Sequence, residues 1–245
     1  GAAIGNILGS NFANVFMALG AAALVQTIKF SKNMNYVDIK VLVFSTIIFS
    51  IIIMTLLEHS IWIGIFLIIS LFIYIFYSFK STPLNAVDYK KVENVSKTKS
   101  IIFFLIGLVG VLIGSDFLVK GAIEVANNFG VREAVIGVGI LAFGTSLPEV
   151  ATSIIAALKK ENNIALGNIV GSSIFNILGI GGVTLVASNK LDLVQVDMNL
   201  YDLFPFMLSS LIFLVFYIFK LNINKLYGFL FVLFYILWIT LIFLN

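Results

Sequence analysis

The sequence predicts an all-α, polytopic membrane protein. Of the 245 residues, 60% are apolar or aromatic and 11% are charged, and the mean hydropathy is +1.11. Globular domains carry roughly 45–50% apolar and about 25% charged residues. Several apolar runs approach the roughly 20 residues that a helix needs to span a bilayer. Residues 41–57 and 61–79 are apolar on all sides with no alternation of period two, which excludes a transmembrane β-barrel and predicts helices in contact with lipid.

Polar breaks divide the chain into eight candidate spans. They cover residues 3–28, 39–57, 61–79, 100–127, 133–158, 164–188, 201–219 and 225–244. One long polar connection, residues 80–99, contains Pro83, Asp88 and several Lys, and we interpret it as a hinge linker. It separates a first group of three helices, residues 1–79, from a second group of five, residues 100–245.

Basic residues are distributed unevenly between alternate connections. Twelve of the 15 Lys and Arg lie in one set, which includes residues 80–99, and three lie in the opposite set. Lys and Arg tend to remain on the cytoplasmic side of a membrane. We therefore expect the 80–99 linker in the cytoplasm of a multi-pass protein of the cell (plasma) membrane.

The residue types that are absent exclude several functions. The chain contains no Cys and one His, His59, so disulfides, thiolate metal sites, histidine zinc sites and Ser-His-Asp triads are excluded. The net charge of +3 is small and gives no reason to expect a nucleic-acid partner. We expect a protein embedded in the lipid bilayer that is not an enzyme and has no cofactor.

Two segments of the chain repeat one another. Residues 3–14 read AIGNILGSNFAN and residues 165–176 read ALGNIVGSSIFN, with seven of twelve positions identical at an offset of 162. Two matched Gly, one Ser and two Asn are hard to obtain by chance inside hydrophobic helices. The second copy lies five spans after the first, an odd number, so it crosses the membrane in the opposite direction. Inverted repeats are typical of secondary transporters, whose substrate site lies near the bilayer midplane between the copies.

The span 100–127 contains small and charged residues that we assign to structure. Small residues permit close helix packing in membranes, as in GxxxG interfaces, and we expect Gly107, Gly110 and Gly114 to serve only this purpose. Asp116 lies four residues before Lys120, a spacing that predicts an ion pair along one helix face. We favour a structural or peripheral role for Asp116 over direct binding of an ion.

The span 133–158 contains an ionisable residue deep in the membrane, Glu149. A carboxylate at the centre of a membrane helix costs about 2.5–3.5 kcal/mol on insertion scales, so it is a functional candidate by default. Pro148 lacks an N–H and disrupts the helix one turn earlier. Thr145 and Ser146 precede Glu149 by about one turn. A single broken turn therefore offers a carboxylate, two hydroxyls and free backbone oxygens.

The oxygen-bearing side chains of the broken turn and of the repeat predict a cation site. Hard oxygen donors suit Ca²⁺, which takes 6–8 oxygens, and fewer of the same groups can serve Na⁺. Asn14 and Asn176 add amide oxygens, with Ser10 and Ser172 one helical turn before them on the same face. The alternative for such side chains is interhelical hydrogen bonding. We expect the two asparagines to approach each other near mid-membrane, on helices that bend or break beside the glycines of the repeat.

The motif GTSLPE at residues 144–149, with GNIVGSSIFN at 167–176 and GNILGSNFAN at 5–14, resembles the α-repeats of the cation/calcium antiporter superfamily. The likeness is greatest to archaeal and bacterial sodium/calcium exchangers and covers essentially the whole chain. It implies an inverted-repeat transporter of ten transmembrane helices that exchanges Na⁺ for Ca²⁺ by alternating access. It also implies a set of cation ligands. They are Glu149, Thr145, Ser146, Ser172 and Asn176, with Ser10 and Asn14 as the first-half counterparts and the Ala142 carbonyl as a further donor.

Two departures from the family pattern matter. The offset of 162 places the first-half counterpart of Glu149 before Gly1. We therefore interpret the chain as N-terminally incomplete, with about 8 of 10 helices present and a matching carboxylate on the missing N-terminal helices. Some relatives carry Asp where this chain has Asn176, so the site here has less negative charge. That difference leaves the stoichiometry and the involvement of protons open.

These observations together predict a secondary antiporter in which Ca²⁺ and Na⁺ compete for Glu149. Downhill entry of Na⁺ drives Ca²⁺ out if the protein changes its facing only with a balanced charge, because an uncompensated carboxylate opposes crossing the low-dielectric barrier. Exchange of Ca²⁺ for H⁺, with Glu149 titrating, is the alternative in the same class. A cation channel is the alternative outside it, and it is disfavoured because the polar residues cluster at one depth.

Overall fold

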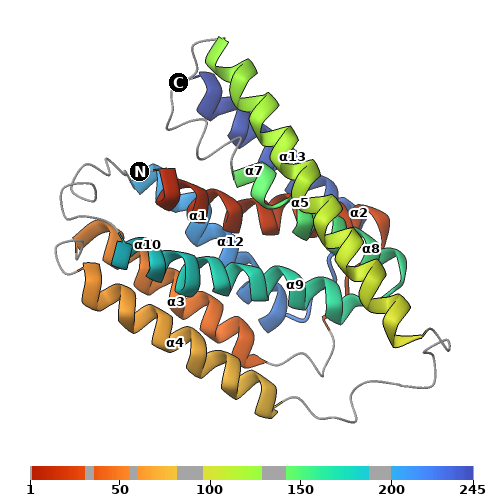
Figure 1. Cartoon of the computed structure of the whole chain (residues 1–245), viewed down its shortest axis with the longest axis horizontal. Helices are drawn as coiled ribbons and strands as arrows, with labels where there is room; N and C mark the ends of the chain where they lie inside the picture. Colours follow the sequence, from red (N-terminus) through yellow and green to blue (C-terminus); the bar gives the residue numbers. More distant parts are fainter. Residues whose placement is uncertain are drawn as a thin grey trace.

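The computed structural model describes residues 2–30, 36–55, 60–81, 96–128, 142–187 and 200–244. Within these ranges every regular element is a helix, and the only strand-like feature is an isolated antiparallel bridge between Ile28 and Ile223. The predicted all-α class is therefore confirmed. Figure 1 shows the helices as a bundle of long, tilted rods.

The helices fall where the apolar runs of the sequence place them. Their bounds are α1 Ala2–Ala13, η1 Asn14–Leu19, α2 Gly20–Val25, α3 Tyr36–Thr55, α4 Ser60–Ser81, α5 Lys97–Asn128, α7 Ala142–Thr145, α8 Leu147–Leu158, α9 Asn162–Ile174, η6 Phe175–Ile180, α10 Gly181–Ala187, α12 Leu200–Ile218 and α13 Lys225–Leu244. Every predicted span overlaps these helices, although part of the span 133–158 and most of the linker 80–99 lie outside the described residues.

Within the described part of the chain, four helical runs are long and apolar enough to cross a membrane, judged by length and composition alone. They are Ala3–Val25, Val37–Thr55, Ile61–Lys80 and Asn162–Ala187. Shorter apolar helices lie between and after them, including Leu203–Ile218 and Lys225–Leu241. The protein is a multi-pass membrane protein.

Both copies of the repeat form one continuous helix with a π-helical segment in the middle. In the first copy, α1 passes into η1 at Asn14 and continues as α2, and in the second copy α9 passes through η6 into α10. The π-segments begin at nearly equivalent positions of the repeat, one at Asn14 and one at Phe175, beside Asn176. A π-turn widens the hydrogen-bond ladder and occurs frequently at functional sites.

The helices are not broken beside the repeat glycines. Gly5 and Gly9 lie within the regular helix α1, and Gly167 and Gly171 lie within α9. A π-bulge is a recognised site of helix irregularity. The irregularity therefore falls later in each copy, at the π-segments.

Two close helix crossings relate the halves of the chain. At the first crossing α2 packs against α13, and a Cβ on Gly228 would lie 2.8 Å from the Gly20 carbonyl oxygen. At the second, α10 packs against α4, and a Cβ on Gly64 would lie 2.5 Å from the Gly182 carbonyl oxygen. Gly182 follows Gly20 by the repeat offset of 162, and Gly228 follows Gly64 by 164. Each half therefore packs its last helix onto the repeat helix of the other half, as an inverted repeat requires.

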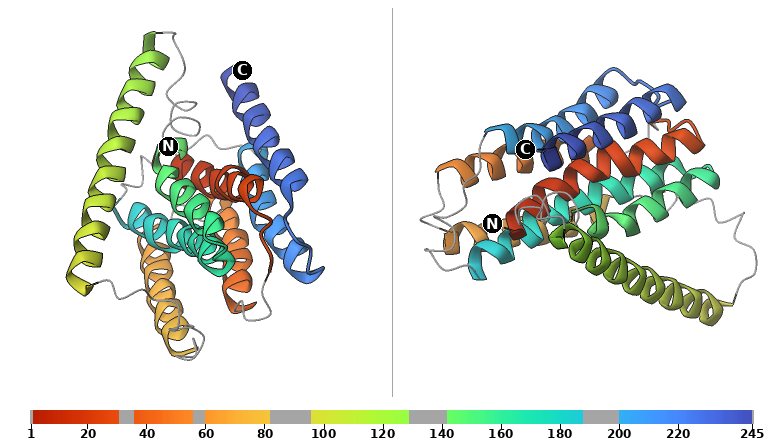
Figure 2. Two further views of the ribbon diagram at one scale, coloured as in Figure 1. Left: turned by 90° about the vertical axis from the view of Figure 1, so that its right-hand side faces the viewer. Right: turned by 90° about the horizontal axis from the view of Figure 1, so that it is seen from above.

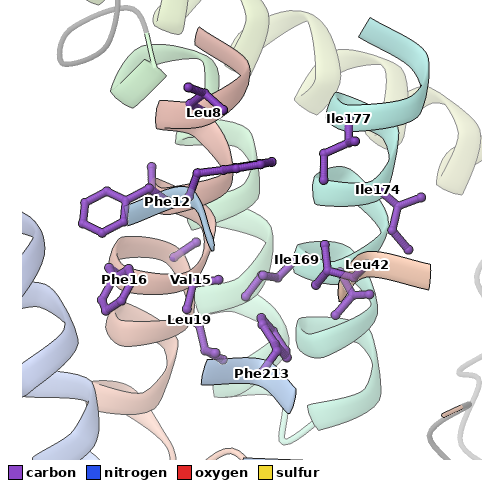
Figure 3. Close-up of a cluster of buried hydrophobic side chains, with 14 of the residues drawn as sticks. Leu8, Phe12, Val15, Phe16, Leu19, Leu42, Ile169, Ile174, Ile177 and Phe213 are labelled. Carbon is purple, nitrogen blue, oxygen red and sulfur yellow. The ribbon is translucent and has the colours of Figure 1, made fainter. Parts of the chain in front are cut away.

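The core lies where the two repeat helices pass each other. Figure 3 shows Ile169 and Ile174 of the second copy on one side of this cluster, with Phe213 of α12 below. Phe12 and Phe16 of the first copy point the other way, and both rings contact Phe234 of α13. Phe12 and Ile169 are fully buried. This apolar packing fixes the relative position of the polar side chains that the same two helices carry.

Helix α5 stands away from the bundle. Figure 2 shows it inclined to the other helices, and its described packing partners are α7 and α8. A Cβ built on Gly107, Gly110 or Gly114 would meet nothing within 4 Å. The expectation that these glycines permit close helix packing is therefore wrong among the described residues, because the face that carries them has no neighbour there.

Candidate cation site

The helix break predicted about one turn before Pro148 lies at Ser146. α7 ends at Thr145, Ser146 has φ −92° and ψ −1°, and α8 begins at Leu147. The Ser146 N–H donates to the carbonyls of both Ala142, at 3.2 Å, and Phe143, at 3.1 Å. Glu149 therefore lies in the first turn of α8, where the positive end of the helix dipole favours a negative charge.

Hydroxyl groups connect this broken turn to the first repeat copy. The Ser10 and Thr145 hydroxyl oxygens lie 2.9 Å apart, and Thr145 Oγ1 lies 3.0 Å from Asn6 Oδ1. Thr145 Oγ1 is also 3.1 Å from the Ala142 carbonyl oxygen, and Ser146 Oγ donates to the Ser10 carbonyl at 3.4 Å. One hydroxyl carries one proton, so Thr145 donates to one of Ser10, Asn6 and Ala142 at a time.

Asn14 connects the two repeat copies at the start of η1. Its side chain is 0% exposed, and its Nδ2 donates to Ser172 Oγ at 2.8 Å and to Ser173 Oγ at 3.3 Å. These two bonds direct the amide nitrogen toward α9. The other end of the same amide, Oδ1, is buried and has no hydrogen-bond partner.

Glu149 presents a second unsatisfied oxygen. Its Oε2 is buried and accepts no hydrogen bond, whereas its backbone carbonyl accepts one from Asn168 Nδ2 at 3.2 Å. Asn168 lies one helical turn before Ser172 on α9, so the two residues share a face. One face of α9 therefore contacts both the turn that carries Glu149 and the side chain of Asn14.

The two unsatisfied oxygens have the chemistry of ion ligands. A buried oxygen without a donor is unfavourable, and native structures leave few of them. Carboxylate and amide oxygens bind Ca²⁺ and Na⁺, so a bound cation satisfies oxygens of this kind. Asn11 Oδ1 and Asn162 Oδ1 are also buried without a partner. Among the described residues, no group of three Asp, Glu, His or Cys side chains could hold a metal ion. The candidate site therefore combines one carboxylate with neutral oxygen donors.

The structure brings most of the predicted ligands together in two groups. Ser10, Thr145, Ser146 and the Ala142 carbonyl form one group, and Asn14 with Ser172 forms the other. The Ala142 carbonyl already accepts a hydrogen bond from the Ser146 N–H and lies 3.1 Å from Thr145 Oγ1, so it is engaged within its own turn.

No hydrogen bond joins Asn176 or Asp116 to these two groups in the described part of the chain. No hydrogen bond joins Asn176 to Asn14, both of which the structure describes, and Asn14 contacts instead the residues one turn before Asn176. Asp116 Oδ2 pairs with Lys120 Nζ at 2.7 Å on the exposed face of α5, as its spacing predicts.

The comparison with protein families decides the identity of the fold. The family model described as sodium/calcium exchanger protein matches residues 1–80 and 99–244. The chain belongs to the sodium/calcium exchanger family. The matched ranges include both repeat copies and the GTSLPE motif.

Individual members of the exchanger family resemble the chain over most of its length. The candidate antiporter CaxA of Alkalimonas amylolytica is 32% identical over 219 residues, which cover 86% of this chain and 68% of CaxA. The sodium/calcium exchanger MaX1 of Methanosarcina acetivorans is 39% identical over 120 residues, 49% of this chain and 33% of MaX1. A structure of the sodium–calcium exchanger NCX_Mj soaked with zero Na⁺ and Ca²⁺ is 30% identical, with a TM-score of 0.78 over 98% of this chain and 76% of that one.

Two side chains of this exchanger escaped the sequence prediction. Asn6 Oδ1 lies 3.0 Å from the Thr145 hydroxyl oxygen, and Asn168 donates to the Glu149 carbonyl and, at 3.1 Å, to Ser153 Oγ. Asn6 and Asn168 are identical positions of the repeat. That identity was the available signal, because a polar residue that recurs in both copies can serve both sides of a site built from the two.

Proposed function

We propose that this exchanger is part of a secondary antiporter that moves Ca²⁺ across the membrane in exchange for Na⁺ by alternating access. The observation that carries the proposal is the pair of buried, unpartnered oxygens, Glu149 Oε2 and Asn14 Oδ1, on elements that pack against one face of α9. Such oxygens suit an ion that enters and leaves, because the ligands are in place before the ion binds.

The proposed ligands come from the broken turn and from both repeat copies. Glu149 supplies the charge, and neutral oxygens complete the shell. These are the hydroxyls of Ser10, Thr145, Ser146 and Ser172, the amides of Asn14 and Asn176, and the Ala142 carbonyl. Ca²⁺ accepts six to eight such oxygens in flexible geometry. A smaller number of the same donors serves one Na⁺.

Competition for Glu149 couples the two ions. One Ca²⁺ more than neutralises the negative charge of the carboxylate, and Na⁺ neutralises that charge when Ca²⁺ is absent. An empty site leaves a bare carboxylate, which is costly to carry through a low-dielectric barrier. The protein therefore changes its facing with an ion bound, and a Na⁺ gradient drives Ca²⁺ uphill.

Exchange of Ca²⁺ for H⁺ is the second candidate function. The proposed ligands include one carboxylate, Glu149, and neutral Asn at both repeat positions 14 and 176. A single carboxylate can carry one proton in place of an ion, and protonation balances its charge just as Na⁺ does.

The proposal also includes the membrane in which the protein lies and its orientation across that membrane. We place the protein in the cell membrane with residues 80–99 in the cytoplasm, because twelve of its 15 basic residues lie on that side of the span order. The lipid bilayer, Ca²⁺ and Na⁺ are its proposed partners.

Uptake of radioactive Ca²⁺ into membrane vesicles tests both functions. Vesicles that contain the protein are loaded with Na⁺, or are given an acid interior, and are diluted into Na⁺-free buffer at a clamped membrane potential. Uptake that follows the Na⁺ gradient and persists when the pH gradient is collapsed supports Na⁺ exchange. Uptake that follows only the pH gradient supports proton exchange, and uptake that follows neither contradicts antiport.

A further inference from the structure

Three exposed lysines surround the one backbone bridge that joins the α2 end to the α12–α13 turn. Ile28 and Ile223 exchange two backbone hydrogen bonds, both of 2.9 Å, and both side chains are fully buried. Lys29 follows the first of them, and Lys220 and Lys225 flank the second. We call Lys29, Lys220 and Lys225 the basic platform. The bridge holds its two chain segments together, although they are far apart in sequence.

The backbone of Lys220 adopts a conformation that favours glycine. Its φ is 50°, and the turn closes with bonds from Lys220 N–H to the Tyr217 carbonyl, at 3.2 Å, and from Leu221 N–H to the Phe216 carbonyl, at 2.9 Å. Helices commonly end in this way with Gly in the left-handed position. A long cationic side chain therefore stands where glycine would be less strained.

The surroundings of the basic platform are cationic and apolar. Residues 14–30 and 203–244 contain no Asp or Glu. The neighbouring α8–α9 turn, at the same end of the bundle in Figure 1, adds two Lys and one Glu, Lys159, Lys160 and Glu161. Phe219 and Leu226 are 68% and 63% exposed beside the lysines. Apolar side chains next to lysines are typical of the depth at which hydrocarbon meets headgroups.

We propose that the basic platform binds the anionic headgroup of a phospholipid in the leaflet that it faces. Three ammonium groups attract a phosphate-bearing headgroup, while Phe219 and Leu226 contact its acyl chains. The bound lipid holds the end of the helix that begins as α1 and carries Ser10 and Asn14. The proposal concerns the membrane partner and is independent of which ions the protein exchanges.

The test measures the association of spin-labelled phosphatidylglycerol, relative to spin-labelled phosphatidylcholine, with the full chain in phosphatidylcholine vesicles. We expect wild type to prefer phosphatidylglycerol, and the Lys29→Gln, Lys220→Gln, Lys225→Gln variant to lower that preference at least about threefold, since each lysine near a membrane surface contributes to anionic-lipid binding and salt screens part of it. Replacement of the same residues by Arg should keep the preference.

A charge-matched control separates the platform from the net charge. Lys40→Gln, Lys80→Gln, Lys99→Gln removes the same charge elsewhere, and it should leave most of the preference. Equal loss in both triple variants, or no preference in wild type, overturns the proposal. If the platform triple variant does not fold, Lys220→Gly removes one charge from a backbone that suits glycine, and an unchanged preference in that variant also overturns it.

Discussion

Asn14 donates a 2.8 Å hydrogen bond from Nδ2 to Ser172 Oγ and so joins the two copies of the inverted repeat at their crossing. The bond fixes the orientation of the amide, because the nitrogen faces α9 and the oxygen is left buried without a donor. The same contact that stabilises the crossing therefore presents a ligand. Removal of either partner should affect ion binding as well as stability.

Replacement of Asn14 by Ala should raise the Ca²⁺ concentration for half-maximal exchange by at least about tenfold, because it removes one oxygen ligand and the bond that orients it. The measurement is the Ca²⁺ dependence of Na⁺-driven uptake in vesicles. Asn11→Ala is the matched control, since Asn11 is also buried and its Oδ1 also has no partner, but its Nδ2 bonds to the Ile7 carbonyl of its own helix and not to the second repeat copy. A similar Ca²⁺ dependence in both variants would mean that Asn14 is only structural.

Replacement of Glu149 by Gln should abolish exchange while the protein still inserts and folds. The amide keeps the shape of the side chain and removes the only charge that we assign to the ligand set. Radioactive Ca²⁺ uptake, with protein quantity and monodispersity measured in parallel, gives the result. Retained uptake would remove Glu149 from the mechanism.

Asp116→Asn is the control for Glu149→Gln, because it also removes one carboxylate from an apolar segment. Asp116 lies on an exposed face of α5 and pairs with Lys120, and an exposed ion pair contributes little to stability. Exchange should fall much less in this variant than in Glu149→Gln. Equal loss in the two would place Asp116 among the ion ligands.

Hydropathy and a few local rules were sufficient to predict much of this molecule. The spans follow from the length of apolar runs, the break near Ser146 follows from the missing N–H of Pro148, and the Asp116–Lys120 pair follows from its spacing. Each of these is a property of a short segment. The hydrogen-bond donors and the periodicity of a short segment can be read from its own residues, so the sequence alone is enough to predict these features.

What failed depends on contacts between segments. The π-segment at Asn14 requires a widened backbone ladder, which no local residue pattern reported, and the sequence instead suggested a bend at Gly5 or Gly9. Gly107 resembles a packing residue, but whether a helix covers it is decided elsewhere in the fold. Asn6 and Asn168 act through partners more than a helical turn away, so only the repeat could have indicated them.

Replacement of Gly64 by Ala should destabilise the protein by about 1–3 kcal/mol, the usual range for overpacking. Its Cβ would lie 2.5 Å from the Gly182 carbonyl oxygen, and backbone cannot move aside as a side-chain tip can. Thermal unfolding in detergent measures the change. Gly107→Ala is the control, because its Cβ would meet nothing within 4 Å, and the better helix propensity of Ala should leave that variant as stable as wild type or more so. Equal destabilisation would contradict the close crossing.

Replacement of Lys160 by Gly should stabilise the α8–α9 turn by about 0.5–1 kcal/mol, because Lys160 has φ 61° and a left-handed conformation costs an L-residue roughly 1–2 kcal/mol. The gain is smaller than that cost, since Gly also increases the entropy of the unfolded chain. Lys159→Gly makes an ideal comparison. It removes the same charge from the adjacent position, but Lys159 has φ −81° and ψ 0°, so Gly relieves no strain there and should lower stability by about 0.5–1 kcal/mol. The melting temperatures of the two variants should therefore move in opposite directions from wild type. A shift of the same sign in both would show that charge, and not backbone conformation, determines the stability of this turn.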